Sequence, residues 1–192
     1  MRASKVIARA SAGGVILAFL ACHIMKTPFF PVEDPMLESK VSTAIMNAAI
    51  MAMSFEFAFE TGKASHNLQM STKTQIFMHY AIIELSYWAY HTAQHTIPFM
   101  WTTTGHAVHH SVGKTVEMSP IDAWVLHPFD FLGWSACAIL PNVFHVTRLH
   151  AKQHTRLLTI MATILMLQHT PGWPGHPAHH SGSGKTSLLL GL

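Results

Sequence analysis

Residues 84–111 read ELSYWAYHTAQHTIPFMWTTTGHAVHHS and carry five histidines in two short clusters; a third cluster follows near the end of the chain. The clusters comprise His91 and His95, then His106, His109 and His110, and last His176, His179 and His180. Residues spaced by three or four lie on one face of a helix, so each cluster can present its imidazoles together. Imidazole is the commonest side-chain ligand of transition metals near neutral pH. The three clusters therefore predict a metal site.

The composition predicts an all-α fold embedded in a membrane. Of the 192 residues, 49% are hydrophobic and only 11% are charged, whereas about a quarter are charged in soluble domains. The net charge of +3 is spread along the chain without a basic block, which argues against nucleic acid as a partner. We expect an integral membrane helical bundle of about four transmembrane or re-entrant helices, with the histidine clusters at one membrane face.

Five apolar segments are the candidates for these helices. They cover residues 10–25, 41–59, 74–90, 121–144 and 157–168. The fourth is interrupted by Pro128, Asp130 and Pro141, so we expect it to be bent or re-entrant. The fifth rises only about 18 Å as a helix, less than the roughly 30 Å hydrocarbon core.

The pattern along the chain predicts one domain with two flanking parts. Residues 1–40 form an N-terminal anchor or a cleaved targeting segment, followed by a proline-containing loop. Residues 41–180 form the membrane domain, and residues 181–192 a flexible tail. That tail contains Gly184 and Lys185, but a phosphate-binding loop also needs a glycine where His179 stands, so nucleotide binding is rejected.

Eight clustered imidazoles exceed the needs of a single four-coordinate ion. The set suits two metal ions with open positions, and nitrogen ligands suit iron, copper or zinc. For one isolated histidine, a hydrogen-bonded surface position is the simpler interpretation. Glu84 lies two helical turns before His91 and either supports a ligand histidine or is an interfacial acid. The nearby aromatic residues are expected to form an interfacial belt; they are Tyr87, Trp88, Tyr90 and Trp101.

The motifs in residues 84–111 resemble the fatty acid hydroxylase/sterol desaturase superfamily. The shared pattern is an acid, a Tyr-Trp pair, an HxxxH motif, a tryptophan and an HxxHHS motif. The step His127-Pro128 stands where a His-Pro step is typical, and residues 176–180 resemble the closing HxxHH motif. The matched region covers about residues 80–180.

The resemblance implies a membrane enzyme of the endoplasmic reticulum, or alternatively of a plastid membrane, with a di-iron centre. Such an enzyme uses molecular oxygen to hydroxylate or desaturate a lipid. Its electrons come from an NAD(P)H-dependent reductase through a haem electron carrier. The implied metal ligands are His91, His95, His106, His109, His110, His176, His179 and His180, with no catalytic residue beyond them. A further ligand is usual before the last motif; we favour His169 over the pair His150 and His154.

Two features leave alternatives open. Many family members have arginine where Thr92 stands, and only twelve residues follow His180. The chain could therefore be a truncated or inactive family member. A histidine-rich membrane metal transporter or metal-binding protein is the alternative from another functional class.

Overall fold

The computed structural model describes an all-helical protein. The described residues are 3–29, 36–61, 71–107, 109–110, 119–144, 149, 151–170 and 173. The helices are α1 (Ala3–Met25), α2 (Leu37–Thr61), α3 (Thr72–Thr96), α4 (Pro98–Thr103), the 3-10 helix η2 (Pro120–Trp124), α6 (Pro128–Val143) and α7 (Ala151–Gln168). No strand occurs among these residues. The expected all-α class is confirmed.

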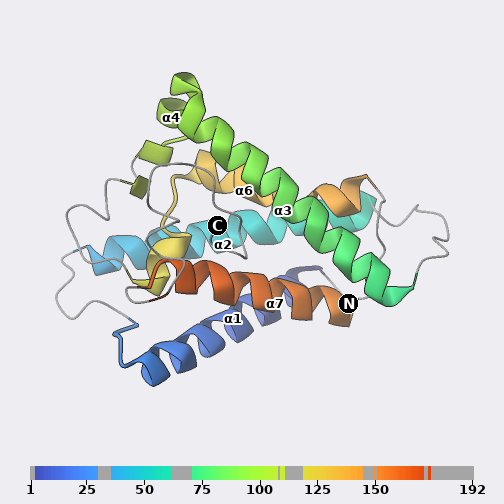
Figure 1. Ribbon diagram of the computed structural model, residues 1–192, viewed down its shortest axis with the longest axis horizontal. Helices are drawn as coiled ribbons and strands as arrows, with labels where there is room; N and C mark the ends of the chain where they lie inside the picture. Colours follow the sequence, from blue (N-terminus) through green and yellow to red (C-terminus); the bar gives the residue numbers. More distant parts are fainter. Residues whose placement is uncertain are drawn as a thin grey trace.

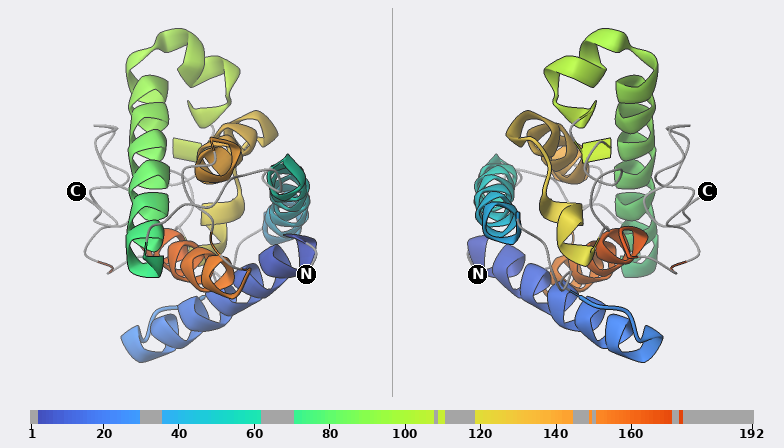
Figure 2. Two further views of the ribbon diagram at one scale, coloured as in Figure 1. Left: turned by 90° about the vertical axis from the view of Figure 1, so that its right-hand side faces the viewer. Right: turned by 90° about the vertical axis from the view of Figure 1, so that its left-hand side faces the viewer.

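The helices pack as two connected groups (Figures 1 and 2). Helix α6 lies between α2 and α3 and contacts both of them, while α1 lies along α7. The short η2 contacts both α7 and α2. Together with the direct contact between α1 and α2, it joins the α1–α7 pair to the group that contains α3 and α6.

Small residues allow α1 and α7 to approach closely. On α1, Ala10, Gly14 and Ala18 recur every four residues and are buried. A Cβ atom added at Gly14 would lie only 2.9 Å from the Cβ of Ala162 on α7. Close approach through small residues at this spacing is a common way to pack two apolar helices.

A buried polar contact links α2 to η2. Nζ of Lys40 lies 2.7 Å from Oδ1 of Asp122, and both side chains are 2% exposed. About two turns further along α2, the Asn47 amide donates hydrogen bonds to the carbonyl oxygens of Trp124 and Leu126. Since buried polar groups are costly unless they are paired, these contacts fix the position of η2 on α2.

The helix boundaries differ from the sequence-based expectation in three places. Helix α2 begins at Leu37, within the expected loop. Helix α7 begins at Ala151 rather than at residue 157, because the polar residues before the apolar run contain neither proline nor glycine. The interrupted segment 121–144 is the 3-10 turn η2 followed by α6, which starts with Pro128 at its first turn and tolerates Pro141 near its end.

One helix of the described chain is long and apolar enough to cross a membrane. It covers residues 8–25 within α1, and the apolar part of α7, residues 155–168, is shorter. Length and composition therefore support one candidate span, whereas we expected about four transmembrane or re-entrant helices.

Candidate metal centre

A turn at the end of α3 brings the first two histidine clusters together. His91 and His95 lie on the last two turns of α3, which ends at Thr96. Pro98 follows after Ile97, and a proline disfavours the helical conformation of the residue before it. The helix therefore ends here, and the chain changes direction before the short α4 begins. This turn returns the backbone toward α3 and places His106 beside His95.

Gly105 makes the turn that leads into the second cluster. Its φ of +73° belongs to the left-handed region, which favours glycine. A Cβ atom here would also lie 2.5 Å from Cγ of His127. His127 in turn caps α6 by accepting a hydrogen bond from the backbone N–H of Phe129. The His-Pro step at residues 127–128 thus starts α6 and packs against the turn at Gly105.

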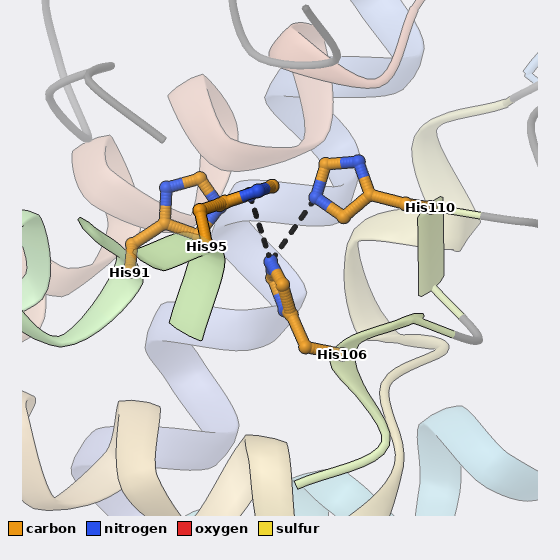
Figure 3. Close-up of side chains that lie close together, drawn as sticks. All are labelled: His91, His95, His106 and His110. Atoms are coloured by element: carbon orange, nitrogen blue, oxygen red, sulfur yellow. Dashed lines mark hydrogen bonds between the residues drawn. The ribbon is translucent and has the colours of Figure 1, made fainter. Parts of the chain in front are cut away.

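Four imidazoles converge in what we call the four-histidine cluster: His91, His95, His106 and His110 (Figure 3). Their ligand nitrogens all lie within 4.8 Å of one another. The Nε2 atoms of His91 and His95 are 3.3 Å apart, those of His95 and His106 3.2 Å, and those of His106 and His110 3.0 Å. These four side chains could hold a metal ion.

The spacing of these nitrogens fits a metal ligand set. With metal–nitrogen bonds of about 2.0–2.1 Å, neighbouring ligands of a tetrahedral or octahedral ion are about 2.9–3.4 Å apart. The three consecutive Nε2 distances, 3.0–3.3 Å, fall within that interval. Imidazole nitrogens of this kind suit iron, copper or zinc.

A buried carboxylate orients one of the four imidazoles. Oδ2 of Asp130, on α6, lies 2.7 Å from Nδ1 of His106. The Gln94 amide donates to Oδ1 of the same carboxylate at 2.6 Å, and the Tyr90 hydroxyl donates to it at 3.3 Å. A proton on Nδ1 of His106 gives the best partner for the carboxylate. The lone pair of Nε2 then points into the cluster, as in the carboxylate–histidine pairs of metal sites.

Burial keeps His95 in its metal-binding protonation state. Desolvation, followed by the neighbouring His106, lowers the pKa of His95 to about 4, although the more distant Asp130 opposes the shift. At neutral pH the His95 ring is therefore uncharged. A neutral imidazole has a free lone pair, which metal coordination requires.

A second pair of imidazoles adjoins the four-histidine cluster. Nε2 of His109 lies 3.1 Å from Nε2 of His169, which directly follows α7, and both side chains are buried. Nδ1 of His169 lies 2.8 Å from the carbonyl oxygen of Leu165. Donation to that carbonyl leaves Nε2 of His169 facing His109. We call these two residues the His109–His169 pair.

The two sets face one small cavity. The ring of His109 lies 5.9 Å from that of His106 and 5.5 Å from that of His110. The cavity, about 20 Å³ in volume, is lined by His91 and His106 of the cluster and by both members of the pair. Its size corresponds to about one water molecule. It therefore provides a position that both sets of imidazoles can reach.

Two of the four aromatic residues expected in an interfacial belt, Tyr87 and Trp101, pack against the imidazoles. Trp101 of α4 lies 5.1–5.6 Å, centroid to centroid, from the rings of His95, His106 and His110. Tyr87 is buried and stacks on His91 at 5.5 Å with an interplanar angle of 10°. These rings limit the access of water and the rotation of the imidazoles.

The structure assigns the supporting carboxylate differently from the sequence-based hypothesis. Glu84 was the candidate for holding the outer nitrogen of a ligand histidine, and that contact is made by Asp130. Glu84 forms a hydrogen bond with the hydroxyl of Tyr80. The reason is geometric: Glu84 lies two turns below His91 on the same helix, whereas α6 crosses α3 at the level of the cluster.

Six of the nine predicted ligands lie within the described residues, and the structure brings them into two adjoining sets. His176, His179 and His180 lie outside those residues, as do His150 and the side chain of His154. His169 faces His109, and its choice over His150 and His154 stays a prediction.

Sequence reasoning missed the polar residues that support the ligands, namely Tyr90, Gln94 and Asp130. Gln94 and Asp130 are almost fully buried. An amide between two histidines and an acid within an apolar run are both unusual unless they are paired. That signal marks them as site residues in the sequence, although it does not identify their partners.

No protein-family model, curated protein or solved structure matches this chain.

Proposed function

We propose that this protein is a membrane-bound, iron- and oxygen-dependent oxidoreductase that hydroxylates or desaturates a lipid of the sterol, fatty acyl or related classes. The observation that carries the proposal is the pairing of two adjoining imidazole sets around one cavity. Such an arrangement offers more nitrogen donors than one structural ion requires. The sequence motifs that resemble lipid hydroxylases and desaturases supply the reaction class.

In this proposal each set of imidazoles holds one iron ion, and the third cluster, with His176, His179 and His180, completes the ligands. The iron pair would supply the activation of molecular oxygen. The protein's own residues do the rest: Asp130 and Gln94 fix the orientation of His106, and Trp101 and Tyr87 keep water from the imidazoles. Exclusion of water protects an oxidising site from side reactions.

The proposed setting is a membrane of the endoplasmic reticulum, or alternatively of a plastid. Helix α1 is the candidate anchor, and the lipid substrate would reach the protein from the bilayer. Electrons would come from an NAD(P)H-dependent reductase through a haem electron carrier, as the resemblance implies. We also propose that the histidine clusters lie at one membrane face.

A second candidate function is metal binding or transport without oxygen chemistry. The four-histidine cluster, of which His91 and His106 are buried, favours it equally, since tight metal binding needs no open position. The two functions differ in oxygen consumption.

The test is lipid-dependent oxygen consumption by the full chain, loaded with ferrous iron in membranes and supplied with a reductase and a haem carrier. We expect oxygen uptake and a lipid product that has gained one oxygen or lost two hydrogens. His109→Ala and His179→Ala should abolish product formation, whereas His23→Ala, an exposed histidine on α1, should not. Metal binding without oxygen uptake would favour the second candidate.

A further inference from the structure

An apolar cleft is lined mainly by residues of α1, α2 and η2. Its volume is about 290 Å³, close to the lower limit of roughly 300 Å³ for pockets that hold small molecules. It is distinct from the cavity between the imidazoles, which lies beyond η2 and α7.

The walls of the cleft offer contacts for hydrocarbon. Val41, Ala44, Ile45 and Ala48 of α2 form one wall, and Val15 of α1 faces them. Ligand pockets are lined predominantly by apolar side chains, which contact the apolar parts of a ligand. The chemistry of the walls therefore selects an apolar occupant.

The shape of the cleft favours a chain. From Val41 to Ala48 the α2 wall extends over two turns, about 10 Å at 1.5 Å per residue. Beyond Val15 on α1, the ring of Phe29 lines the cleft and lies 5.7 Å from that of Phe19. A space of this length and volume accommodates a short segment of an acyl chain.

The rim of the cleft indicates where its occupant comes from. Val15 and Ile45 are 42% and 66% exposed, and next to them Ile16 is also exposed. The rim thus continues into the outer apolar face of α1, the one described helix that is long and apolar enough to span a bilayer. In a membrane this face contacts lipid, so the nearest occupant is the acyl chain of a bilayer lipid.

We propose that the α1–α2 cleft is a binding site for one acyl chain of a bilayer phospholipid. The chain fills space that side chains leave open, and it gains the van der Waals contacts that a void lacks. The site rests on the proposed membrane setting, but it does not depend on the metal centre or on the proposed lipid oxidation. It is a property of α1, α2 and η2.

The test uses the full chain in nanodiscs that contain a phosphatidylcholine with a photoreactive diazirine in one acyl chain. Cross-linked positions are then mapped by mass spectrometry. We expect labels on cleft residues, such as Val15 and Ala44, in addition to labels on outward residues such as Ile16 and Met46.

Two tryptophan substitutions on α2 separate a bound chain from general contact with lipid. Ala48→Trp fills the cleft, whereas Ala49→Trp adds the same ring at a neighbouring exposed position. We expect Ala48→Trp to abolish labelling of Val15 and Ala44 and to leave labelling of Ile16 unchanged, while Ala49→Trp retains all labels.

Equal labelling of cleft residues in both variants would overturn the proposal, as would labels confined to outward residues in the unsubstituted protein. Thermal unfolding of both variants establishes that they fold. A variant that has lost the metal ligand His106 should still label Val15. If the imidazoles bind no metal, the proposed acyl-chain site thus still stands. If the cleft binds no acyl chain, the proposed metal site still stands.

Discussion

The Oδ2 atom of Asp130 lies 2.7 Å from Nδ1 of His106, although 24 residues separate the two in sequence. The contact joins α6 to the segment that follows α4, and it holds one member of the four-histidine cluster. It orients the His106 ring before any ion binds. Four predictions follow from this contact and from the packing around it, and the metal content of the protein tests the account as a whole.

Replacing Asp130 by asparagine should weaken metal binding about 10- to 100-fold, because an outer partner of a ligand histidine contributes that much to affinity. The amide keeps the size of the side chain and removes its charge. Titration of metal-free protein with Fe²⁺ under anaerobic conditions measures the apparent Kd.

Asp122→Asn is the matched control for that substitution. Asp122 is equally buried, but it pairs with Lys40 on α2, away from the imidazoles. It should change stability and leave metal affinity unaltered. Equal affinities for Asp130→Asn and the unsubstituted protein would show that the carboxylate does not support the site.

Gly105→Ala should lower both the melting temperature and the metal affinity. Alanine disfavours the positive φ at this position, and its Cβ would collide with His127, so the loss of stability should exceed about 1 kcal/mol. The turn that positions His106 would have to move. Thr103→Ala, at an exposed position two residues earlier, should have little effect on either quantity; similar behaviour of the two variants would refute the role of the turn.

Gly14→Leu should separate α1 from α7, because the space beside Gly14 is already filled by Ala162 and Met166. Overpacking of this kind costs about 1–3 kcal/mol. Thermal unfolding in detergent measures the loss. The control is Ala12→Leu, an exposed position on the same helix, which should alter stability by less than about 0.5 kcal/mol. Equal melting temperatures would contradict the observed packing.

Lys40→Met should destabilise the protein by about 3–5 kcal/mol, since it leaves the buried carboxylate of Asp122 without its cation. The double variant Lys40→Met with Asp122→Leu removes both charges and should recover most of that loss. The free energy of unfolding of both variants, measured in detergent, tests whether loss of the ion pair causes the destabilisation. A double variant as unstable as the single one would mean that the pair is not the cause.

The helical class and the histidine spacing were predictable from the sequence, since both are local patterns. The stretch from Tyr87 to His95 shows a buried face on α3 with the expected periodicity. The partners of these residues were not predictable, because they depend on how helices cross. Asp130 reaches His106 through the α3–α6 contact, and His169 reaches His109 across 60 residues.

The aromatic residues illustrate the same limit. Tyrosine and tryptophan near the ends of apolar helices are typical of a membrane interface. Tyr87 instead stacks on His91 of the same helix, and Trp101 packs on imidazoles because the chain turns at Pro98. A sequence pattern records which residues share a face, but it does not record which element covers that face.

Elemental analysis of the full chain, purified in detergent under anaerobic conditions, tests the central claim most directly. The account predicts about two iron ions per chain, since the imidazoles exceed the needs of one four-coordinate ion. His106→Ala with His110→Ala should remove one ion, and His109→Ala with His169→Ala the other, while His23→Ala retains both. A protein that binds no iron, or binds the same amount in every variant, would contradict the account.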